Sequence, residues 1–168
     1  TANTTGTDNV AVGSNAGDAV TTSSDNTLIG DNAGGATTTA DNNTAIGSSA
    51  LLVNSTGANN TAIGANVLDA NTTASSNTAV GYNAGTANTT GSSQVLIGAY
   101  AGDALTTGAD NTALGYGALS TATTSSNNTA VGSGALETNA AANNTGVGYY
   151  ALQANTTGTS NVAVGKDA

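Results

Sequence analysis

The sequence predicts an all-β fold, a parallel β-solenoid of ten coils with a repeat length near seventeen. Two observations predict it. The motif N-[TV]-[AL]-[VIL]-G recurs ten times along the 168 residues, with a Gln in one copy and an inner Gly in another. Its closing glycines have a constant spacing of seventeen in eight of nine intervals: Gly13, Gly30, Gly47, Gly64, Gly81, Gly98, Gly115, Gly132, Gly148 and Gly165. A fixed period of this length indicates a repeat architecture.

The ten motif copies are the expected strands. They cover residues 9–13, 26–30, 43–47, 60–64, 77–81, 94–98, 111–115, 128–132, 144–148 and 161–165. A short β-branched run closed by Gly and followed by turn residues is typical of a strand and a corner. Each repeat position supplies a large aliphatic residue only once every seventeen residues. An amphipathic helix needs them about every three or four residues, so this spacing argues against a helix. At about 3.3 Å per residue, each coil has room for two or three short strands around a thin aliphatic core.

One interval is shorter than the rest. The spacing from Gly132 to Gly148 is sixteen, and the polar stretch 138–143 lies between them. Loops tolerate a lost residue better than strands do. We therefore expect a shortened loop here, with the strands on either side still in register.

A carboxamide begins every motif copy, and nine of the ten are asparagines. These are Asn9, Asn26, Asn43, Asn60, Asn77, Asn111, Asn128, Asn144 and Asn161, with Gln94 in the sixth copy. Identical amides stacked coil on coil predict a hydrogen-bonded ladder. Ten copies of one position favour a structural role over ligand binding.

The composition excludes several kinds of chemistry. With no His and no Cys, the usual catalytic triads, thiol nucleophiles and zinc sites are excluded. A single Lys or Arg against ten acids, for a net charge of -9, argues against nucleic-acid binding. No apolar run approaches the roughly 20 residues of a membrane span. The acids lack the spacing of a calcium repeat. We therefore predict no enzyme activity, no cofactor and no metal.

The thin core predicts self-association. A few large aliphatics per coil cannot by burial alone offset the conformational entropy of ordering a whole repeat. Ladder hydrogen bonds and a second face buried against another chain are expected to supply the difference. The chain begins at Thr1 and contains no Met. We expect residues 1–168 to form one repeat domain that is a fragment of a longer fibrous protein.

The motif copies resemble a known family of repeats. N-T-A-I-G at 43–47 and 60–64, and N-T-A-V-G at 77–81 and 128–132, resemble the head repeats of YadA-like trimeric autotransporter adhesins. They are also similar to repeats in bacteriophage tail-fibre shafts. The resemblance implies a left-handed β-roll, a homotrimer with three chains side by side, and an extracellular position on a cell or virion surface. The repeat here is longer than the usual head repeat and starts with Asn in place of Ser.

Five tyrosines are the only aromatic residues, and all fall in the fifth to ninth coils. Tyr82, Tyr116 and Tyr149 directly follow a motif glycine, and Tyr100 and Tyr150 stand one position later. An aromatic face with a polar tip suits a receptor or glycan contact. The alternatives are that these rings cover the corner or pack at a seam between subunits.

The function expected from these features is that of a structural or adhesive fibre segment, presenting a repetitive surface to cells, matrix or glycans. Its expected partners are further copies of itself and a host-surface or matrix ligand, carbohydrate included. One alternative is a self-assembling extracellular filament subunit. Another is an ice-binding β-solenoid that uses rows of Thr. The Thr pairs for this role are Thr21–Thr22, Thr38–Thr39, Thr72–Thr73, Thr89–Thr90, Thr106–Thr107, Thr123–Thr124 and Thr156–Thr157, and a more regular Thr row runs from Thr27 to Thr145.

Overall fold

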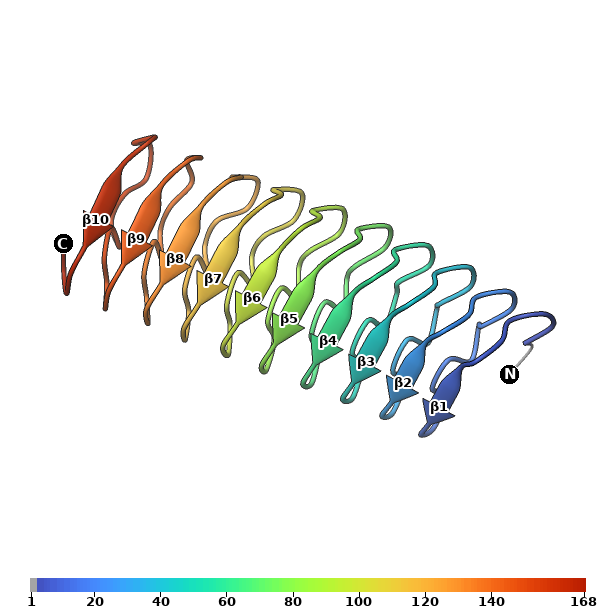
Figure 1. The fold of residues 1–168 in the computed structure, drawn as a ribbon. Helices are drawn as coiled ribbons and strands as arrows, with labels where there is room; N and C mark the ends of the chain where they lie inside the picture. Colours follow the sequence, from blue (N-terminus) through green and yellow to red (C-terminus); the bar gives the residue numbers. More distant parts are fainter. Residues whose placement is uncertain (1–2) are drawn as a thin grey trace.

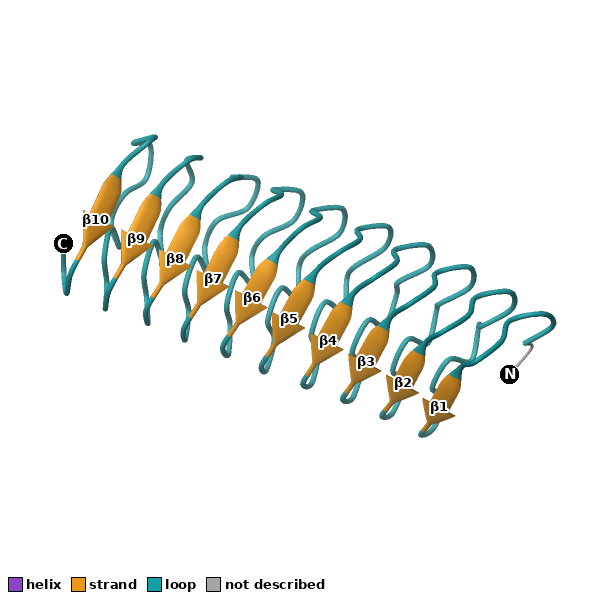
Figure 2. Ribbon diagram, viewed as in Figure 1, coloured by secondary structure: helices purple, strands orange, loops and turns teal. Residues whose placement is uncertain are grey.

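The computed structural model describes residues 3–168 as a rod of stacked coils, with one short strand in each coil (Figure 1). Strands and loops account for all of the described residues, with no helix among them (Figure 2). The strands are β1 (Val10–Val12), β2 (Thr27–Ile29), β3 (Thr44–Ile46), β4 (Thr61–Ile63), β5 (Thr78–Val80), β6 (Val95–Ile97), β7 (Thr112–Leu114), β8 (Thr129–Val131), β9 (Thr145–Val147) and β10 (Val162–Val164). The chain is therefore a β-solenoid.

All ten strands form a single parallel sheet in chain order, as the repeat predicts. Val10 pairs with Thr27, and the same step of seventeen continues along the sheet. Between β8 and β9 the step is sixteen, from Thr129 to Thr145. The shorter interval therefore leaves the strand register intact.

The missing residue lies in the loop of the eighth coil. The Ala140 N–H donates to Thr156 O at 3.3 Å, and the Asn143 N–H donates to Ser126 O at 3.1 Å. Two residues separate Ala140 from Asn143, where the second coil has three residues between the equivalent pairing positions. The predicted loop shortening is confirmed.

The expectation of two or three strands per coil is wrong, because each coil contains one three-residue strand. Left-handed backbone explains the difference. In the third coil, φ is positive at four positions, which are Gly47 (137°), Ser49 (57°), Leu51 (51°) and Asn59 (58°). Each of these positions turns the chain sharply, so the segments outside the motif do not pair as strands.

The motif glycine is required by close stacking of the coils. A Cβ on Gly47 would lie 2.2 Å from the carbonyl oxygen of Gly64 in the next coil. Its φ of 137° is also strained for any residue with a side chain. Both constraints recur from Gly13 to Gly148, and at Gly165, in the last coil, the positive φ remains.

Four leucines adopt left-handed backbone inside the rod. Leu51, Leu68, Leu119 and Leu136 have φ between 49° and 56°, and each is fully buried. A left-handed conformation costs a non-glycine residue roughly 1–2 kcal/mol. Burying a leucine side chain stabilises by about 1.5–3 kcal/mol, which offsets that cost.

The core contains the middle residue of the eight inner strands, β2 to β9, and the aliphatic column at the third strand position faces outward. Leu28 and Ala45, in the middle of β2 and β3, are fully buried. Ile63 and Leu114, at the third position of β4 and β7, are 37% and 43% exposed. The predicted thin aliphatic core is present, but strand alternation turns the third-position column to its outside.

Candidate functional site

The motif carboxamides form a continuous ladder along the rod. In each coil the backbone N–H of the motif amide donates to the side-chain oxygen of the amide one coil earlier. Examples are Asn43 to Asn26 at 2.9 Å and Asn60 to Asn43 at 2.9 Å. The same bond occurs at all nine steps. These amides are largely buried from Asn26 to Asn144, so the column holds the coils together and offers little to a ligand.

The same side chains also tie each coil to itself. The Nδ2 of Asn26 donates to Ala40 O at 2.9 Å, and that of Asn43 donates to Gly57 O at 3.0 Å, each bond joining groups fourteen positions apart. One buried amide thus satisfies a backbone carbonyl near the end of its own coil and the backbone N–H that begins the motif of the next coil. Buried backbone groups need such partners, which gives the column its structural role.

The outer sheet face is the first candidate binding surface. We define it as the first and third residues of the ten strands, which point away from the core. The third position is aliphatic in every strand: Val12, Ile29, Ile46, Ile63, Val80, Ile97, Leu114, Val131, Val147 and Val164. The first position is Thr in seven strands and Val in three. At about 4.8 Å per strand, this face presents an apolar row beside a Thr row over most of the rod length.

The strand threonines leave their hydroxyls unused within the protein. Among the described residues, no hydrogen bond to another side chain or to the backbone involves the Oγ1 of Thr27, Thr44, Thr61, Thr78, Thr112, Thr129 or Thr145. The Thr pairs of the loops differ. Thr38 Oγ1 donates to Ser55 O at 3.0 Å and Thr72 Oγ1 donates to Thr89 O at 3.1 Å. The first member of a loop pair therefore supports the next coil, and the freer Thr row is the one on the sheet.

The structure brings three of the five tyrosines together. The Tyr100 ring lies 5.5 Å from the Tyr82 ring and 5.9 Å from the Tyr116 ring, centroid to centroid. Interplanar angles of 87° and 78° make both contacts edge to face. We call these three residues the tyrosine strip. Tyr149 and Tyr150 form a separate pair with centroids 4.2 Å apart. The sequence places the first three in successive coils and the pair two coils later, but it does not show which rings are in contact.

The charged groups near the rings are acidic. Partial desolvation raises the pKa of Tyr100, and the neighbouring Tyr82, Tyr116 and Asp103 raise it further. Burial also raises the pKa of Asp103, although the backbone N–H groups of Asp103 and Ala104 act in the opposite direction. The Tyr100 phenol therefore loses its proton less readily than an ordinary tyrosine, and the Asp103 carboxyl lies near it.

The tyrosine pair has the single cation of the chain above it. A hydrogen bond with Tyr149 and the charge of that phenol raise the pKa of Tyr150. Lys166 Nζ lies 5.9 Å from the centroid of the Tyr149 ring and 3.6 Å from an Asp167 carboxylate oxygen.

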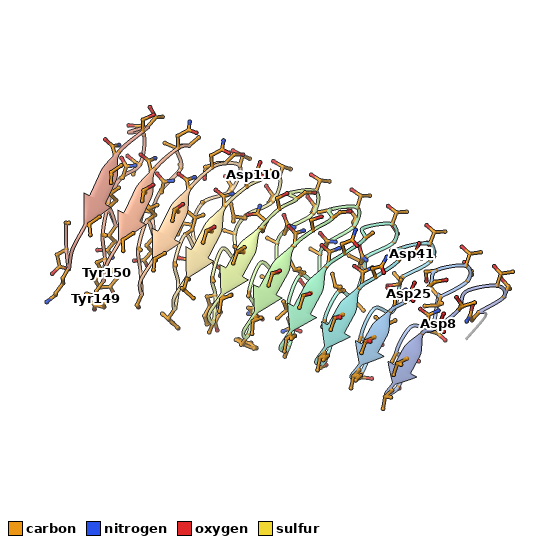
Figure 3. All side chains as sticks on the ribbon, viewed as in Figure 1. Asp8, Asp25, Asp41, Asp110, Tyr149 and Tyr150 are labelled. Atoms are coloured by element: carbon orange, nitrogen blue, oxygen red, sulfur yellow. The ribbon has the colours of Figure 1, made fainter. Side chains whose placement is uncertain are left out.

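The two long edges of the sheet differ in chemistry. Figure 3 shows Asp8, Asp25, Asp41 and Asp110 along the edge where the strands begin, and the tyrosine pair beyond the edge where they end. Asp41 accepts a hydrogen bond from the Ser24 N–H at 2.7 Å. Within residues 3–168, no three His, Cys, Asp or Glu side chains are grouped closely enough to hold a metal ion.

The geometry defines the chain as a parallel β-solenoid with an amide-ladder core, an outer sheet face and an aromatic edge. No family model, curated protein or solved structure matches the chain. The part of the chain that the structure describes has no helix able to cross a bilayer.

Proposed function

We propose that the chain is a structural and adhesive segment of an extracellular fibre, in which three copies associate side by side through the outer sheet face. The resemblance to trimeric adhesin heads supports the number of chains and a left-handed roll. The observation that carries the proposal is the partly exposed aliphatic row at the third strand position. An apolar row this long is costly in water, and another chain is the partner that removes it from solvent along its whole length.

The association is repetitive because the face is repetitive. Each strand contributes one aliphatic side chain and one Thr or Val at the same register. A partner with the same period meets the same contact in every coil, so many small contributions add up along the rod. The resulting rod holds its long edges away from the cell or virion surface that bears the fibre. The tyrosine strip lies on one of these edges and is available for attachment.

Light scattering after size exclusion tests the association. We expect a discrete species of three times the 15.8 kDa of one chain. Ile63→Asp, on the outer sheet face, should reduce the mass to that of one chain, because association would bury its charge. Val53→Asp is the matched control, since Val53 is 39% exposed and Ile63 37%, and Val53 lies outside the strands. A wild-type monomer, or a trimer that survives Ile63→Asp, contradicts the proposed interface; polymers of indefinite length favour the filament function.

A second candidate is ice binding through the same face, which the unused hydroxyls of the strand threonines favour. A sheet with even strand spacing offers these hydroxyls and methyls to ordered water at a regular repeat. Ice recrystallisation assays distinguish the two functions. Ice binding requires a free face, so activity should come from the monomer and be lost in Thr61→Lys with Thr78→Lys. An inactive monomer excludes this function.

A further inference from the structure

The tyrosine strip exposes aromatic side chains at a turn that does not need them to form. Tyr82 is 49% exposed and Tyr116 is 64% exposed. Other coils fill the position of these two residues with Ser, Asp, Ala or Lys and keep the same turn. The corner therefore closes without a ring, and the three rings in successive coils are available for another role.

The arrangement of the rings favours a compact ligand over a flat one. Tyr100 stands nearly perpendicular to both Tyr82 and Tyr116, so the three rings do not share one plane. Perpendicular neighbours form corners in which the face of one ring adjoins the edge of the next. A saccharide that stacks along several rings needs a common plane, whereas a small cation interacts with one face at a time.

The charges also favour a cation. The chain carries a net charge of -9. Asp103 lies close enough to Tyr100 to act on it electrostatically. Its Oδ1 is buried and accepts no hydrogen bond of ordinary geometry among the described residues, although the backbone N–H groups of Asp103 and Ala104 act on the carboxyl and lower its pKa. An acceptor in this state is suited to an N–H donor or a positive charge, and it repels an anionic ligand.

The chain contains an internal example of the same interaction. Lys166 Nζ lies over the Tyr149 ring, and Tyr149 occupies the same repeat position as Tyr82 and Tyr116. A tyrosine at this corner therefore presents its face to an ammonium group. The tyrosine strip has no lysine of its own to take that place, because Lys166 is the single Lys or Arg in the sequence.

We propose that Tyr82, Tyr100 and Tyr116, with Asp103 beside them, form a binding site for an alkylammonium cation supplied by an attachment partner. This inference extends the proposed adhesive function and depends on it for its biological role. The binding itself does not require that chains associate through the outer sheet face. Two sources share the chemistry: a trimethylammonium group of the choline type and the primary ammonium of a lysine side chain.

The test is titration of the full chain with choline and with n-butylammonium, followed by the NMR shifts of the tyrosine ring protons at constant ionic strength. The neutral control is 3,3-dimethylbutan-1-ol, which has the shape of choline without its charge. Saturable binding of a cation, with no saturable binding of the alcohol, supports the site. The tighter of the two cations identifies the source.

Variants separate this site from general attraction to an acidic rod. Tyr116→Leu should weaken cation binding at least about threefold, because one exposed cation–π contact is removed. Asp103→Asn should also weaken it. Tyr149→Leu removes a ring from the same repeat position outside the strip and should leave the affinity unchanged. The proposal is overturned if the alcohol binds as tightly as choline, if no ligand saturates, or if Tyr149→Leu matters more than Tyr116→Leu.

The mass of each sample, measured by light scattering, keeps the two proposals distinct. A monomer that binds choline contradicts the association and supports the cation site. A trimer without saturable cation binding supports the association and contradicts the cation site.

Discussion

The Gln94 N–H donates to Asn77 Oδ1 at 2.9 Å, while the buried Nδ2 of Asn77 has no partner among the described residues. The ladder is thus unbroken at this step, but one of its amides is only partly satisfied. Gln94 is one methylene longer than the asparagines around it, and its Nε2 donates to Gly108 O. In the preceding coils this position is Asn, so the longer side chain of Gln94 is what distinguishes this step of the ladder from the earlier ones.

Gln94→Asn should therefore stabilise the rod. We expect the shorter amide to stack like its neighbours and to let Asn77 Nδ2 find an acceptor, which raises the free energy of unfolding by about 1 kcal/mol. Thermal unfolding followed by circular dichroism measures the change. The reverse substitution, Asn60→Gln, serves as the control and should destabilise by a similar amount. A lower melting temperature for Gln94→Asn would show that Gln94 is the better fit in its own coil.

The large side chain of Leu28 occupies the space that two glycines, Gly17 and Gly34, leave open in the core. A Cβ on Gly17 would lie 2.9 Å from Leu28 Cδ1, and a Cβ on Gly34 would lie 2.6 Å from Leu28 Cδ2. The Leu28 side chain thus fills the space that side chains at Gly17 and Gly34 would otherwise take. Leu28→Ala should cost about 2–5 kcal/mol through the cavity it leaves.

Gly34→Leu should rescue part of that loss. Alone it clashes with Leu28, but the third coil already combines Ala45 in the strand with Leu51 at the position equivalent to Gly34. A double-mutant cycle by urea unfolding should give a favourable coupling energy of at least about 1 kcal/mol for Leu28→Ala with Gly34→Leu. Additive effects would mean that the two positions do not share one space.

Loop and strand threonines should respond differently to loss of the hydroxyl. Thr72→Val removes the bond from Oγ1 to Thr89 O and should cost about 1 kcal/mol. Thr78→Val, on the outer sheet face, loses no bond within the chain, and Val95 occupies the same position one strand later. Its stability should stay within about 0.5 kcal/mol of wild type. Equal losses in the two variants would contradict the assignment of structural and free hydroxyls.

The raised pKa of Asp103 predicts a specific pH dependence. Above the ordinary Asp value of 3.8, the native carboxyl retains its proton while the unfolded one releases it. The folded state then binds more protons, so the free energy of unfolding falls as pH rises through this window. Asp103→Asn should be more stable than wild type at pH 7 and similar to it at pH 3.

Asp110→Asn removes the same unit of charge from an exposed position and is the control for Asp103→Asn. It should show a smaller gain at pH 7 in the same thermal unfolding series. If both variants gain equally, the effect belongs to the net charge of the rod and not to the burial of Asp103.

The constant period of the repeat was enough to predict the parallel stacking, the chain order of the strands and the loop that absorbs the missing residue. Stacking in register follows from repetition alone, because each residue then meets its own counterpart in the next coil. The repeated Asn at the motif start likewise predicted a stack of amides, and the structure shows which backbone groups those amides bind.

The tertiary structure alone decided which columns face inward. The position of Ile63 looks like core in the sequence and lies outside, whereas Leu51 lies inside on left-handed backbone that its residue type disfavours. Likewise, no column of the repeat indicated that Tyr100 bridges Tyr82 and Tyr116. The physical reason is that several residues per coil turn the chain sharply. A residue's place in the repeat then fixes its neighbours along the rod, while the direction of its side chain depends on how the whole coil closes.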